Sequence, residues 1–183
     1  METQLRQHPS EVLRIAFVGP ECTGKTTLSK ALAAQHHTLW VEEYMRTYLQ
    51  KKWDEQGLTC TPDDLLPIAI GQVAQENALA LQAHRYLFCD TCLLELVIYS
   101  YLYYGTCDPL LEQAALTHRY HHLFLTFTDV PWQGDDLRDK PHERESVFNF
   151  FRNKLDLFHI PYTILKGSVA EMMRVCNGLL EFS

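Results

Sequence analysis

Residues 19–26 read Gly-Pro-Glu-Cys-Thr-Gly-Lys-Thr, and this octapeptide decides the fold. It follows a short apolar run, residues 14–18, and leads into residues 23–35, whose apolar positions recur at helical spacing. A G-x-x-x-x-G-K-[ST] motif between a buried strand and a helix is a phosphate-binding P-loop. The backbone N–H groups of such a loop and the helix N-terminus surround anionic oxygens. A chance match is disfavoured by this strand–loop–helix setting, so the sequence predicts a nucleotide-binding site.

Individual residues of this loop have distinct expected roles toward ATP and Mg²⁺. We expect Lys25 to bridge the β- and γ-phosphates, the Thr26 hydroxyl to ligate Mg²⁺, and Thr27 to donate toward the α-phosphate. Gly24 lets the backbone approach the phosphates because it has no Cβ. The other residues of the predicted nucleotide site are Gly19, Glu21, Cys22 and Thr23.

The rest of the chain alternates between short apolar runs and longer amphipathic ones. Expected strands cover residues 14–18, 38–41, 86–89, 122–127 and 162–165. Expected helices cover residues 23–35, 42–51, 62–85, 93–104, 110–118, 143–158 and 169–180. Residues 53–61 are expected to form a loop, with Thr61 as the N-cap of the next helix. This alternation indicates an α/β fold, a P-loop NTPase with a five-stranded parallel sheet sandwiched between helices.

Length and composition limit the alternatives. The 183 residues fit one domain, 1–183, in which we expect residues 1–11 to be a short flexible lead-in. The formal net charge of −7 argues against a nucleic-acid partner, because phosphate backbones require clustered Lys and Arg. No apolar run is long enough for a membrane span.

No secretory leader precedes the six cysteines, so we expect reduced thiols and a cytoplasmic protein. The spacing of Cys89 and Cys92 is interpreted as coincidence because no second pair follows at zinc spacing. The oligomeric state stays open.

Acidic residues follow two of the expected strands. Asp90 ends the strand at residues 86–89, where a P-loop protein places the carboxylate that holds Mg²⁺ through water. It is also a possible N-cap for the next helix, and both roles are compatible. Glu42 and Glu43 follow the strand at residues 38–41, at the sheet edge that faces the ligand crevice. A carboxylate there can accept the proton of an attacking hydroxyl, with Arg46 one helical turn further on. We favour Glu43 over Glu42, with a solvated Glu/Arg helix pair as the alternative.

The stretch after the fourth expected strand has the composition of an active-site lid. We expect a lid at residues 129–145, in which Arg138 and Arg144 neutralise the transferred phosphate and Trp132 stacks on a substrate ring. The alternative is a surface loop whose Trp132 is part of the core.

The chain resembles the ribosylnicotinamide kinase domain of the NadR family and its stand-alone P-loop relatives. The likeness runs from Gly19 to Gly167. Its motifs are Gly19-Pro20-Glu21-x-Thr23-Gly24-Lys25, Glu43-Tyr44-x-Arg46, Ile68-Ala69-x-Gly71-Gln72, Asp90-Thr91, Asp129-x-Pro131-Trp132-x-x-Asp135-Asp136-x-Arg138-Asp139 and Ile160-Pro161-Tyr162. The Pro-Trp…Arg-Asp segment is the specific part. Cys22 and Cys92 depart from the family pattern, which usually has Ser and often Asp or Asn there.

This resemblance implies ATP-dependent phosphorylation of the ribose 5′-hydroxyl of nicotinamide riboside to nicotinamide mononucleotide. The implied catalytic residues are Lys25, Glu43, Asp90 and Arg138, and the implied substrate contacts are Glu43, Arg46, Gln72, Asp90, Trp132 and Asp136. Two alternatives remain: a P-loop kinase of another nucleoside or small metabolite, and a nucleotide-binding regulatory module without catalysis. The intact Lys25, Thr26 and Asp90 disfavour the second.

Overall fold

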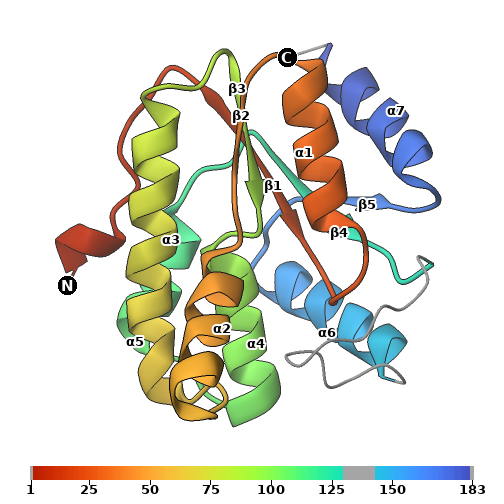
Figure 1. Ribbon diagram of the computed structural model, residues 1–183. Helices are drawn as coiled ribbons and strands as arrows, with labels where there is room; N and C mark the ends of the chain where they lie inside the picture. Colours follow the sequence, from red (N-terminus) through yellow and green to blue (C-terminus); the bar gives the residue numbers. More distant parts are fainter. Residues whose placement is uncertain (1, 130–142, 182–183) are drawn as a thin grey trace.

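Five parallel strands form one sheet in the order β2-β3-β1-β4-β5 (Figure 1). The structure is a computed structural model and describes residues 2–129 and 143–181. The strands are β1 (Leu13–Val18), β2 (Leu39–Val41), β3 (Tyr86–Asp90), β4 (His122–Thr126) and β5 (Thr163–Leu165). All five lie within two residues of the predicted ranges, and the predicted α/β fold class is confirmed.

The helices connect successive strands. They are α1 (Lys25–Gln35), α2 (Tyr44–Gln56), α3 (Leu65–Ala80), α4 (Leu93–Tyr104), α5 (Pro109–Thr117), α6 (Arg144–Leu157) and α7 (Val169–Leu180). Two 3₁₀ turns, Glu2–Leu5 and Pro62–Asp64, precede β1 and α3. Parallel strands cannot be joined by tight turns, so a helix crosses over between one strand and the next. These crossover helices cover both faces of the sheet.

Alternate residues of β1 face the two layers of helices. Ile15 and Phe17 pack with residues of α1 and α7, whereas Ala16 and Val18 belong to a larger core with α2 to α6. In Figure 1, α1 and α7 accordingly stand together on one side of the sheet, and α2, α3 and α4 stand on the other. All four of these strand residues are fully buried, which explains why the strand reads as a continuous apolar run rather than an alternating one.

Two helix ends differ from the sequence prediction. The helix expected at residues 42–51 begins at Tyr44 and extends to Gln56, over the first residues of the loop predicted at 53–61. It ends where Gly57 adopts φ 65° and donates its N–H to the Trp53 carbonyl, a glycine C-cap that stops the helix without strain. The helix expected to reach residue 85 ends at Ala80. Thr61 caps the turn ahead of it as predicted, and its N–H donates to the Asp64 carboxylate at 2.7 Å.

The segment expected as a flexible lead-in packs against the domain. Leu5 is 2% exposed, and the Leu5 carbonyl lies 2.8 Å from Nε2 of His118, just after α5. Gln7 Nε2 donates to Glu76 of α3 at 2.8 Å, and the His8 N–H donates to Asn77 at 2.8 Å. The sequence does not reveal this packing, because one buried leucine in a polar stretch has no periodicity.

Candidate active site

The phosphate loop lies between the carboxyl end of β1 and the start of α1. Gly24 caps α1 in the left-handed conformation with φ 87°, as a residue without Cβ can do at low cost. Gly19 has φ 141°, and a Cβ there would lie 2.7 Å from Oγ1 and 2.9 Å from the carbonyl of Thr126. Thr126, at the end of β4, also hydrogen-bonds Thr23 within the loop at 2.6 Å. The backbone at Gly19 is therefore shaped by close approach to the neighbouring strand.

Lys25 is buried beneath this loop. Its Nζ donates to the carbonyls of Gly19 and Pro20 at 2.7 and 2.9 Å, and lies 3.5 Å from Oε1 of Glu95. Burial by itself lowers the pKa of Lys25, but the carboxylates around it, foremost Glu95 and then Glu43, raise it above its ordinary value. The side chain is thus a fixed positive charge at the loop that the sequence assigns to the phosphates.

Glu95, on α4, is a site residue that sequence reasoning missed. Besides its ion pair with Lys25, it accepts the Gly19 N–H at 3.0 Å, so it joins the two ends of the phosphate loop. Burial raises the pKa of its carboxyl to about 8. The signal was present: Glu95 is the one charged residue in the apolar run from Leu93 to Tyr104. A carboxyl on a buried helix needs a partner, and such partners cluster at functional sites.

Asp90 and Thr26 meet at the point expected for Mg²⁺. Asp90 is paired with Phe17 across β1 and β3, and its Oδ2 accepts the Thr26 hydroxyl at 2.5 Å. Burial raises the pKa of Asp90, and the bond from Thr26 partly offsets this shift. Its other oxygen, Oδ1, is buried and has no hydrogen-bond partner among the residues that the structure describes. A hydroxyl beside an orphaned carboxylate oxygen fits the preference of Mg²⁺ for oxygen ligands and bound water.

The residue after Asp90 has an unusual backbone. Thr91 adopts φ 71°, and its N–H donates to the Phe17 carbonyl at 3.1 Å. A positive φ is rare for a β-branched residue and costs on the order of 1–3 kcal/mol. The turn it makes leads directly from β3 to the start of α4, which carries Glu95.

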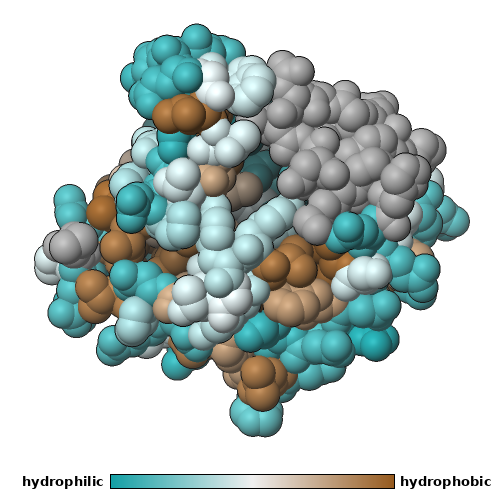
Figure 2. Space-filling view, turned by 90° about the horizontal axis from the view of Figure 1, so that it is seen from below, coloured by the Kyte–Doolittle hydropathy of each residue, from teal (hydrophilic) through white to brown (hydrophobic). Residues whose placement is uncertain are grey.

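A cleft of about 500 Å³ joins the phosphate loop to the start of α2. Residues 21–27 form one wall, and Glu42, Glu43 and Arg46 lie on the other. The structure brings both candidate carboxylates to the cleft, with Glu42 the more exposed, and it does not choose between them. In Figure 2, which views this side of the molecule, hydrophilic residues are interspersed with smaller apolar patches.

Gln72 lies where a small pocket extends from this cleft. Its Oε1 accepts the Tyr44 N–H at 2.8 Å and so fixes the first turn of α2. Its buried Nε2 has no partner among the described residues, and the same holds for the hydroxyl of Tyr99. Both residues line the pocket together with Glu43 and Thr91. The pocket therefore offers polar groups beside the predicted phosphate site to a bound molecule.

The expected lid falls mostly outside the described residues. Trp132, Asp136 and Arg138 lie in the part of the chain that the structure does not describe, so their roles stay predictions from the sequence. Arg144, at the start of α6, donates to the Cys22 carbonyl of the phosphate loop at 2.8 Å. Asp129 accepts the Gly167 N–H at 2.6 Å.

Cys89 and Cys92 are free, buried thiols, and burial raises the pKa of both. Within residues 2–129 and 143–181, no cluster of His, Cys, Asp and Glu is suited to a metal ion. The helices of the same part of the chain include none with the length and apolar character of a membrane span.

Comparison with known proteins agrees with this architecture. The crystal structure of NadR in complex with NR superimposes with a TM-score of 0.77 at 19% identity, covering 94% of this chain and 52% of that one. Deoxyadenosine kinase from M. mycoides superimposes with a TM-score of 0.67 at 12% identity, covering 93% of this chain and 100% of that one. At these identities the likeness establishes the fold.

Sequence relatives point the same way. The trifunctional NAD biosynthesis/regulator protein NadR of Salmonella typhimurium is 26% identical over 130 residues, which are 71% of this chain and 32% of that protein. The chain thus spans about a third of the length of the curated relative it matches. The resemblance to NadR expected from the sequence is confirmed. The model of a family described as an AAA domain matches residues 14–172, nearly the whole chain, and the protein therefore belongs to this family of AAA domains.

Proposed function

We propose that this protein is an ATP-dependent kinase that phosphorylates the ribose 5′-hydroxyl of nicotinamide riboside and yields nicotinamide mononucleotide. The observation that carries the proposal is the cleft in which Lys25 and Thr26 face Glu42 and Glu43. Phosphoryl transfer needs little covalent help from the protein; it needs the two reactants in line and the charge on the phosphates neutralised. The cleft has a wall suited to each requirement.

On the phosphate wall, the loop N–H groups and Lys25 bind the triphosphate of ATP. Thr26 and Asp90 are the residues that would hold Mg²⁺, which neutralises charge on the phosphate oxygens when bound. Arg144 is positioned by its bond to Cys22 to add a further positive charge at the loop.

On the opposite wall, Glu43 orients the acceptor hydroxyl and accepts its proton. The hydroxyl oxygen forms the new bond to the γ-phosphorus, and the bond from that phosphorus to the bridging oxygen breaks, releasing ADP. Arg46 and the amide nitrogen of Gln72, which has no partner among the described residues, bind the nucleoside. Trp132 is proposed from the sequence alone to stack on the nicotinamide ring, because a Trp face attracts a flat cationic ring. Similarity to NadR supports nicotinamide riboside as the acceptor, while similarity in fold to deoxyadenosine kinase keeps other nucleosides as the second candidate.

A coupled assay that measures ADP release with a panel of nucleosides tests this proposal. The panel contains nicotinamide riboside, nicotinic acid riboside, uridine, cytidine and deoxyadenosine, each with ATP and with GTP. We expect the highest kcat/KM with nicotinamide riboside. A higher value with another nucleoside would reassign the substrate, and nucleotide binding without turnover on any acceptor would favour a regulatory module.

A further inference from the structure

Two consecutive residues of α3 contact the start of α2. The side-chain oxygen of Gln72 accepts the Tyr44 N–H at 2.8 Å, and Gly71 lies against the ring of the same tyrosine. Tyr44 is the first residue of α2 and directly follows Glu43, the carboxylate that the proposed mechanism places at the acceptor hydroxyl. The contacts of α3 with Tyr44 therefore bear on where Glu43 lies.

The capping of α2 is shared with α3. Glu43 occupies the N-cap position, but its side chain makes no capping hydrogen bond. The first N–H groups of a helix have no partner within the helix, and an N-cap side chain normally satisfies one of them. Here Gln72 accepts such an N–H from a neighbouring helix. The Glu43 carboxylate does not cap α2 and instead lines the cleft.

Gly71 leaves no room for a side chain. A Cβ added there would overlap three atoms of the Tyr44 ring, Cε1, Cζ and Cδ1. Gly71 lies in the interior of α3, where alanine is the better helix former. Its φ is not positive, so an alanine at this position would disturb the contact with the Tyr44 ring and not the backbone of α3.

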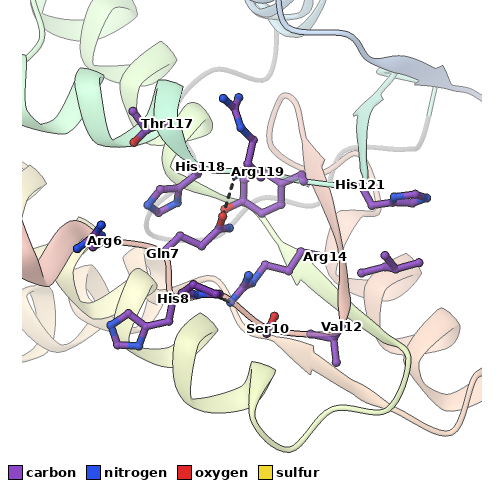
Figure 3. A pocket seen from close by; sticks show the side chains of 13 residues that line it. Arg6, Gln7, His8, Ser10, Val12, Arg14, Thr117, His118, Arg119 and His121 are labelled. Atoms are coloured by element: carbon purple, nitrogen blue, oxygen red, sulfur yellow. Dashed lines mark hydrogen bonds between the residues drawn. The ribbon is translucent and has the colours of Figure 1, made fainter.

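The other half of α3 is held firmly in place. Glu76 is buried, lies 3.0 Å from Nε of Arg14 and accepts a hydrogen bond from Gln7 at 2.8 Å. Gln7 in turn accepts the Arg119 N–H at 2.8 Å, the bond drawn dashed in Figure 3. These bonds tie α3 to β1, to the amino-terminal segment and to the residues after α5. A methyl group at position 71 would therefore displace the first turn of α2 rather than α3.

The remainder of α2 has its own anchors. Asp64, in the turn before α3, accepts the Tyr48 hydroxyl at 3.2 Å and pairs with Lys52 at 2.6 Å. Leu49 is buried in the core between these two residues. A disturbance at Tyr44 is thus confined to the first turn of the helix, next to the cleft.

We infer that Gly71 is a positioning residue for Glu43: because it has no side chain, the Tyr44 ring can lie against α3, and this contact sets the place of the Glu43 carboxylate in the cleft. This positioning role rests on the proposed function, in which Glu43 orients the acceptor hydroxyl. A misplacement of about 1 Å can lower a rate on the order of a hundredfold. A residue that does not touch the substrate can therefore limit turnover.

Steady-state kinetics of Gly71→Ala test this role with the best acceptor of the nucleoside panel. We expect kcat to fall at least about tenfold, with KM for ATP unchanged because the phosphate loop forms the other wall of the cleft. In a Glu43→Gln background the same change should lower kcat less than about twofold, because Gly71 acts through that carboxylate. An equal loss of kcat in both backgrounds would overturn the inference and leave the proposed kinase activity standing.

Thermal melting tests the contact without turnover, so its outcome does not depend on the proposed function. Gly71→Ala should lower the melting temperature of the wild-type protein, because the methyl group displaces the Tyr44 ring. In a Tyr44→Ala background the ring is absent, and the same change should raise the melting temperature by about 1–4 °C, since alanine is the better helix former. An increase in both backgrounds would show that the ring leaves room for a methyl group, and the inference would be wrong.

Two control variants separate positioning from a general loss of stability. Gly178→Ala makes the same change within α7, where a Cβ meets nothing within 4 Å, and should leave kcat unchanged. Leu49→Ala removes a buried side chain from α2 itself, so it should lower the melting temperature. Its kcat should stay within about twofold of wild type, because the Tyr44 contact is kept. A loss of kcat in Leu49→Ala as large as that in Gly71→Ala would assign the effect to loosened packing of α2 and would also overturn the inference.

Discussion

The Nζ atom of Lys25 lies 3.5 Å from Oε1 of Glu95, and Oε2 of the same carboxyl accepts the N–H of Gly19. One buried carboxyl therefore holds both the lysine and the first glycine of the phosphate loop. Burial raises its pKa to about 8, so this group changes charge near neutral pH, next to the proposed phosphate site. An ion pair in such a setting depends on pH in a way that a surface pair does not.

The first prediction concerns stability against pH. The folded-state pKa of Glu95 is about 8 and its ordinary value is 4.5, so between these limits the folded state binds more protons than the unfolded state. Its contribution to the free energy of unfolding must therefore fall as pH rises through this window. Glu95→Gln imitates the protonated carboxyl and removes that fall. The stability of Glu95→Gln relative to wild type should increase from pH 5 to pH 8, by at most about 1.4 kcal/mol per pH unit.

Urea denaturation at pH 5, 6, 7 and 8 measures this difference. Glu55→Gln is the control, because Glu55 lies on the exposed face of α2 and pairs with Lys51 at 3.8 Å. Its stability difference from wild type should not vary with pH. A flat difference for Glu95→Gln as well would show that Glu95 does not titrate in this range.

Removal of the phosphate-loop lysine should affect turnover most. Lys25→Ala deletes the charge that acts on the transferred phosphate, and we expect kcat to fall on the order of a hundredfold or more. Circular dichroism should show a folded protein. Near-normal turnover of Lys25→Ala would remove the basis of the proposed mechanism.

The two carboxylates at the start of α2 can be separated by substitution. Glu43→Gln keeps the shape of the side chain but cannot accept the proton, so kcat with saturating ATP should fall by about a hundredfold. Glu42→Gln is the matched variant one residue away, and we expect it to retain most activity. The reverse pattern would assign the acceptor hydroxyl to Glu42.

A substitution at Gly19 tests whether the phosphate loop approaches β4 closely. Gly19→Ala places a methyl group 2.7 Å from Oγ1 of Thr126 at a φ of 141°, so we expect a loss of about 1–3 kcal/mol of stability and weakened nucleotide binding. Gly178→Ala is the control, since a Cβ there meets nothing within 4 Å and the residue lies within α7. That change should stabilise by about 0.5–1 kcal/mol. Thermal melting compares the two, and equal melting temperatures would contradict the predicted clash.

The packed amino-terminal segment gives a prediction independent of function. Leu5→Ala should lower the free energy of unfolding by about 2–3 kcal/mol, because its side chain is 2% exposed. Leu58→Ala, at a position 53% exposed, should change it by less than about 0.5 kcal/mol. Urea denaturation distinguishes them, and a silent Leu5→Ala would mean that the segment adds no stability.

Much of the fold was accessible from local patterns. The five strands are short apolar runs bounded by polar residues, and the P-loop motif specifies the first strand–loop–helix unit. Ends of helices were less predictable: α2 extends over residues 53–56, which were expected to be in a loop, because Gly57 supplies its C-cap. Helix propensity and the spacing of apolar residues say little about where a helix ends, so the capping residue decides the position of the last turn.

The sequence by itself determined the phosphate loop, its position directly after β1, and the acidic residues that follow β2 and β3. These are consequences of chain connectivity, because the carboxyl ends of parallel strands must meet at one edge of the sheet. Only the tertiary structure decided that Glu95 reaches Lys25 and that Thr126 shapes the loop at Gly19. Such contacts join residues far apart in the chain, and their free energies depend on burial and distance, which no local pattern of residues records.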